Sequence, residues 1–158
     1  MNQKSVIRVL FVCTGNICRS PTAEGLARQL ASSMGVADRF EFDSAGTHAY
    51  HVGEAPDSRA RKAAKARGYD LSALRARLVE PADFERFDLI LAMDRSHLTH
   101  LRRLCPAPLA HKIDLFLNQS RQYAGQDLHD PYYGDAEDFE TVLDQCEDAL
   151  REMFGKSA

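Results

Sequence analysis

Several features that mark other classes of protein are absent or scarce in this 158-residue chain. No stretch approaches the roughly 20 consecutive apolar residues that a membrane-spanning helix needs, so no membrane span is expected. Four cysteines are too few for a secreted disulfide scaffold, and the start of the chain lacks the cleavage site of a secretory signal. There is no internal repeat, low-complexity tract or linker. These absences predict a cytoplasmic protein that forms one domain over residues 1–158, with an ordered core of about residues 5–155.

An excess of positive charge is also missing. The chain carries 20 Lys and Arg against 23 Asp and Glu, a net charge of −3. Proteins that bind nucleic acid usually present a strongly basic face, so nucleic acid is not an expected partner.

Apolar segments of strand length recur between helical patterns. Residues 6–12 form a nearly continuous β-branched run, as expected of a strand that is covered on both faces. Similar but weaker patterns predict further strands at residues 40–45, 88–93 and 112–117. The alternation of strands and helices predicts an α/β fold: one four-stranded, mainly parallel twisted sheet with helices on both faces.

Helical spacing follows each of these strands. Pro21 suits the first position of a helix, with Ser20 as its cap and Gly35 as its end. Further helices are expected at residues 60–67, after Asp94, and across a long final apolar stripe from residue 139 to residue 153. Residues 118–138, which come before the final apolar stripe, are expected to have no regular secondary structure.

The segment from Cys13 to Ser20 joins the first strand to the first helix. A short loop in this position can turn its backbone N–H groups toward one point, and the positive end of the helix dipole lies behind it. Gly15 and Asn16 tolerate unusual backbone angles, and Arg19 offers a planar fork for two phosphate oxygens. The same positive field favours the thiolate of Cys13, so the loop predicts a phosphate site with a cysteine nucleophile.

Residues 12–21, Val-Cys-Thr-Gly-Asn-Ile-Cys-Arg-Ser-Pro, resemble the signature of the low-molecular-weight protein tyrosine phosphatases, in their bacterial form. The resemblance covers nearly the whole chain, through residues 43–47, 56–60, 87–94 and 130–134. It implies that Cys13 is the nucleophile, that Arg19 binds phosphate and that Asp130 is the general acid and then the general base. Taken alone, Asp130 is read more readily as part of an ordinary Asp-Pro turn, and its company with Cys13 and Arg19 favours the catalytic role.

The resemblance also assigns supporting roles. Ser20 would donate to the sulfur of Cys13, and Asn16 and Ser44 would brace the loop. Cys18 would trap oxidised Cys13 as a reversible disulfide, although simple packing is the alternative. The remaining residues named for the site are loop members and aromatic walls: Thr14, Gly15, Ile17, Tyr50, Tyr132 and Tyr133. Tyr133 is alternatively a loop-packing residue or a phosphorylation target.

One departure from the family concerns Leu74, which stands where many members have a histidine, so a contact that braces the loop is in doubt. The six histidines of the chain are expected to be scattered and solvent-facing.

The implied activity is hydrolysis of phosphotyrosine and small aryl phosphates through a phosphocysteine, which needs no metal or other cofactor. The implied partners are phosphotyrosine proteins, a tyrosine kinase, and inorganic phosphate or similar oxyanions as product and inhibitors. The protein would be a monomer or weak dimer. Three alternatives stay open: a protein arginine phosphatase, an arsenate reductase on the same scaffold, and a phosphate-binding module without catalysis. The absence of cysteine from residues 79–104 disfavours the reductase, and Ile17 disfavours the arginine phosphatase.

Overall fold

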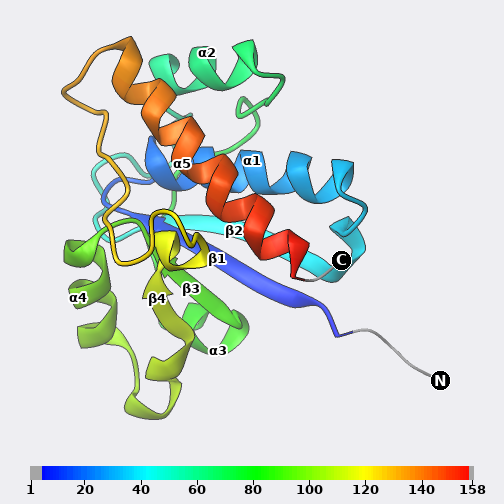
Figure 1. The fold of residues 1–158 in the computed structure, drawn as a ribbon. Helices are drawn as coiled ribbons and strands as arrows, with labels where there is room; N and C mark the ends of the chain where they lie inside the picture. Colours follow the sequence, from blue (N-terminus) through cyan, green and yellow to red (C-terminus); the bar gives the residue numbers. More distant parts are fainter. Residues whose placement is uncertain (1–4, 157–158) are drawn as a thin grey trace.

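The computed structural model describes residues 5–156, and the ends of the predicted domain, residues 1–4 and 157–158, lie outside the described residues. Four strands form one sheet in the order β2-β1-β3-β4, and every pairing is parallel (Figure 1). The strands are β1 (Ile7–Cys13), β2 (Phe40–Gly46), β3 (Leu89–Ala92) and β4 (Ile113–Leu115). The predicted α/β fold with its parallel sheet is confirmed.

Helices cover both faces of the sheet, as predicted. In Figure 1, α1 (Arg19–Ser33) and α5 (Ala136–Gly155) lie above the sheet, and α3 (Asp83–Arg86) and α4 (Arg95–Leu104) lie below it. The helix α2 (Ser58–Ala66) packs against α5, and three short 3₁₀ segments complete the fold. Those segments are η1 (Ala37–Arg39), η2 (Ala107–Lys112) and η3 (Phe116–Gln119).

The alternation of side chains along β1 divides the core into two. Val9 and Phe11 point into the cluster beneath α1 and α5, whereas Leu10 and Val12 point into the cluster beside α3 and α4. All four side chains are fully buried. A strand that is buried on both faces explains the unbroken apolar run in the sequence.

Several predicted boundaries were wrong. The first helix begins at Arg19 rather than Pro21, so Ser20 lies inside it and does not cap it. The second helix begins at Ser58 rather than Ala60, because the carboxylate of Asp57 accepts the N–H of Arg59 and caps it. The fourth strand ends at Leu115, where the chain turns into η3. The four-residue helix α3 was missed because one turn is too short to show helical periodicity.

The central position of β1 determines where a site can form. The chain passes from β1 to β2 on one side and from β3 to β4 on the other, so the connections after the adjacent strands β1 and β3 lead in opposite directions. In open parallel sheets a crevice opens outside the carboxyl ends of the strands at such a point. Cys13 is the last residue of β1 and therefore lies at this crevice. Among the described residues, no helix is both long enough and apolar enough to cross a membrane.

Candidate active site

The loop after β1 is held with its carbonyl groups facing outward. Four of these carbonyls accept backbone N–H groups from outside the loop or from the next turn: Cys13 from Thr47, Thr14 from His48, Ile17 from Asp57, and Cys18 from Thr22. The N–H groups of residues 15–18 have no hydrogen-bond acceptor in the described part of the chain. Since outward carbonyls leave the amides facing inward, the loop forms an anion nest.

Asn16 is the residue that shapes this loop. It has φ 58°, the one positive φ outside glycine in residues 5–156, and asparagine tolerates this left-handed conformation. Its Nδ2 donates to the hydroxyls of Ser20 (2.8 Å) and Ser44 (2.9 Å), and its Oδ1 accepts the N–H of Arg77 (3.0 Å). Ser44 in turn donates to the buried carboxylate of Glu24 at 2.6 Å. The side chains of Asn16 and Ser44 therefore contact the loop as the resemblance implies.

The bracing contact placed in doubt by Leu74 is made by a neighbouring main-chain group. Leu74 itself packs against the apolar core, while the backbone of Arg77 holds Asn16. The guanidinium of Arg77 is fixed between Asp43 (3.1 Å) and the fully buried Asp83 (3.0 Å). The loop is thus braced without a histidine at position 74.

The first turn of α1 completes the nest. Cys18 is its N-cap residue, no side chain caps it, and its first turn carries no acidic residue. Free N–H groups at a helix start, together with the helix dipole, attract anions. The hydroxyl of Ser20 lies 2.9 Å from Sγ of Cys13 instead of capping the helix, which corrects the cap prediction and agrees with the contact that the resemblance implies.

Cys13 and Cys18 are both free and buried thiols, but their surroundings differ. Cys18 packs in an apolar cluster with Ile17 and Phe139. Burial and then the negative charge of Asp57 raise the pKa of Cys18 far above its usual range. Cys18 is therefore a thiol at neutral pH, while Cys13 faces the nest and the pocket.

Arg19 is fixed at the floor of the site. Its side chain is only 5% exposed, and its Nη1 donates to Oδ2 of Asp94 (2.9 Å) and to the carbonyl of Leu128 (3.0 Å). Its Nη2 lies 3.5 Å from Oδ2 of Asp130. Burial opposes ionisation of Asp94, but the hydrogen bond from Ser96 and the nearby positive charges outweigh it and lower the pKa of Asp94 to about 2. The buried guanidinium therefore has a permanent counter-charge.

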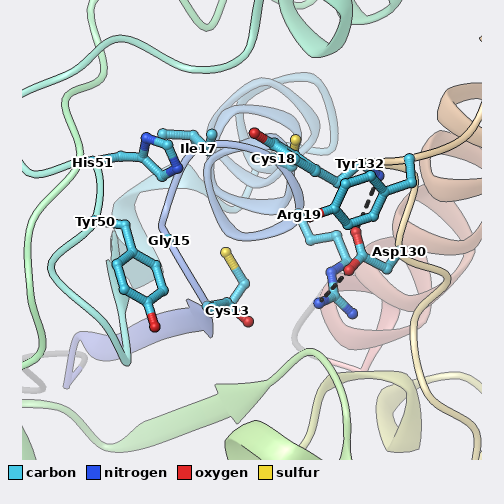
Figure 2. Close-up of a pocket in the computed structure, with 11 residues that line it drawn as sticks. Cys13, Gly15, Ile17, Cys18, Arg19, Tyr50, His51, Asp130 and Tyr132 are labelled. Carbon is cyan, nitrogen blue, oxygen red and sulfur yellow. Dashed lines mark hydrogen bonds and ion pairs between the residues drawn. The ribbon is translucent and has the colours of Figure 1, made fainter.

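The pocket above the nest is a cavity of about 250 Å³ that brings Cys13, Arg19 and Asp130 together (Figure 2). This volume is below the roughly 300–1,000 Å³ of pockets that enclose drug-sized ligands, so it suits a single side chain. Tyr50 and Tyr132 lie on either side of Cys13 in Figure 2. The pocket lining further includes Thr14, Gly15, Ile17, Cys18, His51 and Tyr133.

Side chains from neighbouring segments hold the two aromatic walls. Tyr50 is 71% exposed and stacks on His48, with ring centroids 5.1 Å apart. Arg59 holds the second wall, because its guanidinium donates to the carbonyl of Tyr132 (2.8 Å) and lies over the ring of Tyr132. Tyr133 is 95% exposed and contacts Tyr132 edge to face, so it lies at the rim rather than in a wall.

The prediction that the histidines face solvent was wrong at His97, and the partly exposed His51 also contributes to the site. His51 lines the pocket and packs over Gly15, where an added Cβ would lie 2.8 Å from its ring. His97 is buried, and its Nε2 lies 2.8 Å from the hydroxyl oxygen of Thr14. The sequence showed only that His97 is the third residue of a helix with an aspartate cap. The contact joins residues 83 apart, which no local pattern could reveal.

Known proteins resemble this chain in both sequence and structure. The family model described as low molecular weight phosphotyrosine protein phosphatase matches residues 8–157. The chain belongs to this family. Its relatives include a putative low molecular weight protein-tyrosine-phosphatase of Synechocystis, 42% identical over 94% of each chain, and the human low molecular weight phosphotyrosine protein phosphatase, 39% identical over 99% of each chain.

A solved structure of the family has the same fold. The crystal structure of a protein tyrosine phosphatase from Entamoeba histolytica, with Hepes in its active site, matches this chain with a TM-score of 0.91 and 38% identity over 96% of each chain. The predicted family is therefore confirmed.

Gly46 leads to a prediction about the shape of the nest. It lies opposite Cys13 in the sheet, and a Cβ there would lie 2.7 Å from the carbonyl oxygen of Thr14 and 3.2 Å from the nitrogen of Asn16. Gly46→Ala should therefore displace the loop and weaken inorganic phosphate binding, measured by calorimetry, by about 10- to 100-fold, the worth of one charged hydrogen bond. Gly155→Ala, which meets nothing within 4 Å, is the control. Unchanged phosphate affinity in Gly46→Ala would show that the loop does not depend on this close approach.

The burial of His97 leads to a prediction about stability. Burial, followed by the charge of Arg19, lowers the pKa of His97 to about 4, although Asp94 and Asp130 oppose this. The unfolded chain binds a proton at a pKa of about 6.5, so below that pH it binds more protons than the folded chain and stability falls as pH drops toward 4. Between pH 7 and pH 5 the contribution of His97 to the free energy of unfolding should fall by about 2 kcal/mol.

Urea unfolding of the wild type and of His97→Gln at the two pH values measures this contribution. The variant lacks the ring that titrates at position 97, so it should lose about 2 kcal/mol less between pH 7 and pH 5. The same pH-dependent loss in both proteins would contradict the assignment.

Proposed function

We propose that this protein is a protein tyrosine phosphatase that hydrolyses phosphotyrosine and small aryl phosphates through a phosphocysteine on Cys13. The observation that carries the proposal is the position of the Cys13 sulfur in a nest of inward-facing amides, with Arg19 and Asp130 in the same pocket. The names of the related phosphatases and of the matched family support the same activity.

The reaction that fits this site has two steps. Sγ of Cys13 attacks phosphorus, the bond from phosphorus to the phenolic oxygen breaks, and Asp130 gives its proton to that oxygen. Asp130 then takes a proton from water, whose oxygen attacks phosphorus and releases the thiolate and inorganic phosphate. The loop amides and Arg19 stabilise the negative charge of the phosphoryl oxygens, and the hydroxyl of Ser20 stabilises the thiolate. Asn16 and Ser44 keep the loop in shape, and none of these steps calls for a metal.

The walls of the pocket favour an aryl substrate over phosphoarginine. Tyr50 and Tyr132 lie on either side of the nucleophile, and Ile17 adds an apolar surface. The arsenate reductase alternative needs additional cysteines in the region after the third strand to relay a disulfide, and residues 79–104 contain none. Cys146 lies fully buried in α5, where burial raises its pKa.

Several finer statements belong to the same proposal. The single domain over residues 1–158 acts in the cytoplasm, where reduced thiols persist, as a monomer or weak dimer. Its substrates are phosphotyrosine proteins, a tyrosine kinase is a further partner, and the highly exposed Tyr133 is the residue that such a kinase would reach.

Cys13→Ser tests the proposal. The change removes the thiolate but leaves the nest and Arg19, so turnover of p-nitrophenyl phosphate should be lost while inorganic phosphate or vanadate still binds. Cys105→Ser, a thiol at the end of α4 outside the pocket, is the matched control and should retain full activity. Turnover in Cys13→Ser above roughly one hundredth of the wild-type rate would exclude the covalent mechanism.

The role of Asp130 as general acid is tested by its leaving-group dependence. Asp130→Ala should slow hydrolysis of a phosphotyrosine peptide by about 10²- to 10⁴-fold, and of p-nitrophenyl phosphate by less, because p-nitrophenolate leaves without a proton. Asp127→Ala on the same loop is the control, since Asp127 pairs with Arg95 and does not line the pocket. Equal losses on both substrates would mean that Asp130 only shapes the loop.

We propose that Cys18 is the redox partner of Cys13. Cys13 oxidised to a sulfenic acid would lose hydroxide, released as water, as the Cys18 sulfur attacks to form the disulfide. Mild peroxide should therefore inactivate the enzyme reversibly, and mass spectrometry should find a Cys13–Cys18 disulfide that thiol reverses. Because burial keeps Cys18 protonated, closure should quicken as pH rises. Sulfonic acid on Cys13 as the main early product would contradict the pairing.

A further inference from the structure

His97 is a buried side chain that the chemistry proposed above does not use. It lies in the first turn of α4 and is only 2% exposed. Its Nε2 is 2.8 Å from Oγ1 of Thr14, the residue directly after the nucleophile. Thr14 is exposed and lines the pocket that holds Cys13. His97 therefore connects α4 to the phosphate loop through one hydrogen bond, whose direction depends on which ring nitrogen carries the proton.

The surroundings of Nδ1 decide that question. Nδ1 lies 3.2 Å from the backbone nitrogen of Asp94, and this contact is half of a capping box. A backbone N–H can only donate, so Nδ1 must accept and carries no proton. Oδ1 of Asp94 also lies 3.3 Å from Nδ1, but it already accepts the N–H groups of Ser96 and His97 and the hydroxyl of Ser96. A proton on Nδ1 would oppose the N–H of Asp94 and leave that donor unpaired.

The neutral ring therefore carries its proton on Nε2 and donates it to Oγ1 of Thr14. A hydroxyl has one hydrogen. Because Oγ1 of Thr14 accepts the proton of Nε2, the hydroxyl hydrogen of Thr14 cannot point toward His97. That hydrogen can therefore be donated to another acceptor. Since Thr14 lines the pocket, a phosphoryl group bound above the nest would offer it acceptor oxygens.

We propose that His97 is a positioning residue that orients the Thr14 hydroxyl as an additional donor to the phosphoryl group. The inference rests on the phosphatase function proposed above. It gives the anion site a donor from a side chain, besides the loop amides and Arg19. It also explains why a histidine is buried here, because the helix cap uses only Nδ1 and leaves Nε2 free for Thr14.

The charges around His97 keep this arrangement in one state. The groups that act on the ring are Asp94, Arg19, Asp130 and His48, and burial is the strongest influence. Burial lowers the pKa of His97 to about 4, so the ring is neutral at the pH of the cytoplasm and the direction of the bond does not change there.

The test measures the binding of inorganic phosphate by calorimetry in the wild type, Thr14→Val, His97→Leu and the double variant. A hydrogen bond to a charged group is lost in each single variant, so each should bind phosphate about 10-fold more weakly. If His97 acts through Thr14, the double variant should be no weaker than Thr14→Val, within about twofold. Thr14→Ser, which keeps the hydroxyl, should restore affinity. The control variant is His111→Leu. It changes an exposed histidine in η2, which lies at the end of the sheet opposite the pocket, and should bind phosphate like the wild type.

Losses that multiply in the double variant, or normal affinity in Thr14→Val, would overturn the inference. Because His97→Leu also removes a helix cap and can unfold the protein, ¹⁵N NMR of the wild type provides a second measurement. The ring of His97 should show the proton on Nε2, and a proton on Nδ1 would equally overturn it. Hydrolysis of p-nitrophenyl phosphate by the wild type is assayed separately, so that failure of the proposed function is seen apart from failure of this inference.

Discussion

The left-handed backbone of Asn16 is the constraint on which the active site depends. An L-residue in this conformation costs roughly 1–2 kcal/mol, and three hydrogen bonds to the Asn16 side chain hold it there. Those bonds come from α1, from β2 and from the segment before α3, so the loop has its shape only when all three are packed. The buried Glu24, whose pKa is raised by burial, extends the same network into the core of α1. Folding and formation of the anion site are therefore one event.

The charge of Arg19 is also neutralised and fixed in place when the protein folds. A buried guanidinium without a partner would be strongly destabilising, and Asp94 neutralises it at 2.9 Å. Because Nη1 is occupied by Asp94 and Leu128, the plane of the guanidinium is set before any anion arrives. The entropy of ordering this long side chain is lost on folding, not on binding. Such preorganised charge is the usual source of electrostatic stabilisation in enzymes.

The sequence revealed those parts of the site that adjacent residues encode. The apolar run of β1, the Cys-x5-Arg spacing and the Asp94 cap are local, and the strand, loop and helix that they predict are present. The contacts between residues far apart in the chain could not be predicted from the sequence. Arg77 contacts Asn16 across 61 residues through its main chain, which no side-chain pattern displays. Ser20 satisfied a local rule for helix caps, yet its hydroxyl contacts Cys13, because the helix starts two residues earlier than that rule predicts.

The two aromatic walls have a consequence for how this enzyme could diverge. Tyr50 and Tyr132 stand on surface segments that are separate from the strand and helix carrying the nucleophile. Tyr50 stacks on His48, and Tyr132 is held by Arg59. Loops tolerate sequence change far better than buried backbone. Natural variation in residues 47–53 and 131–133 can therefore change which phosphoproteins dock, while Cys13, Arg19 and Asp130 are inherited unchanged.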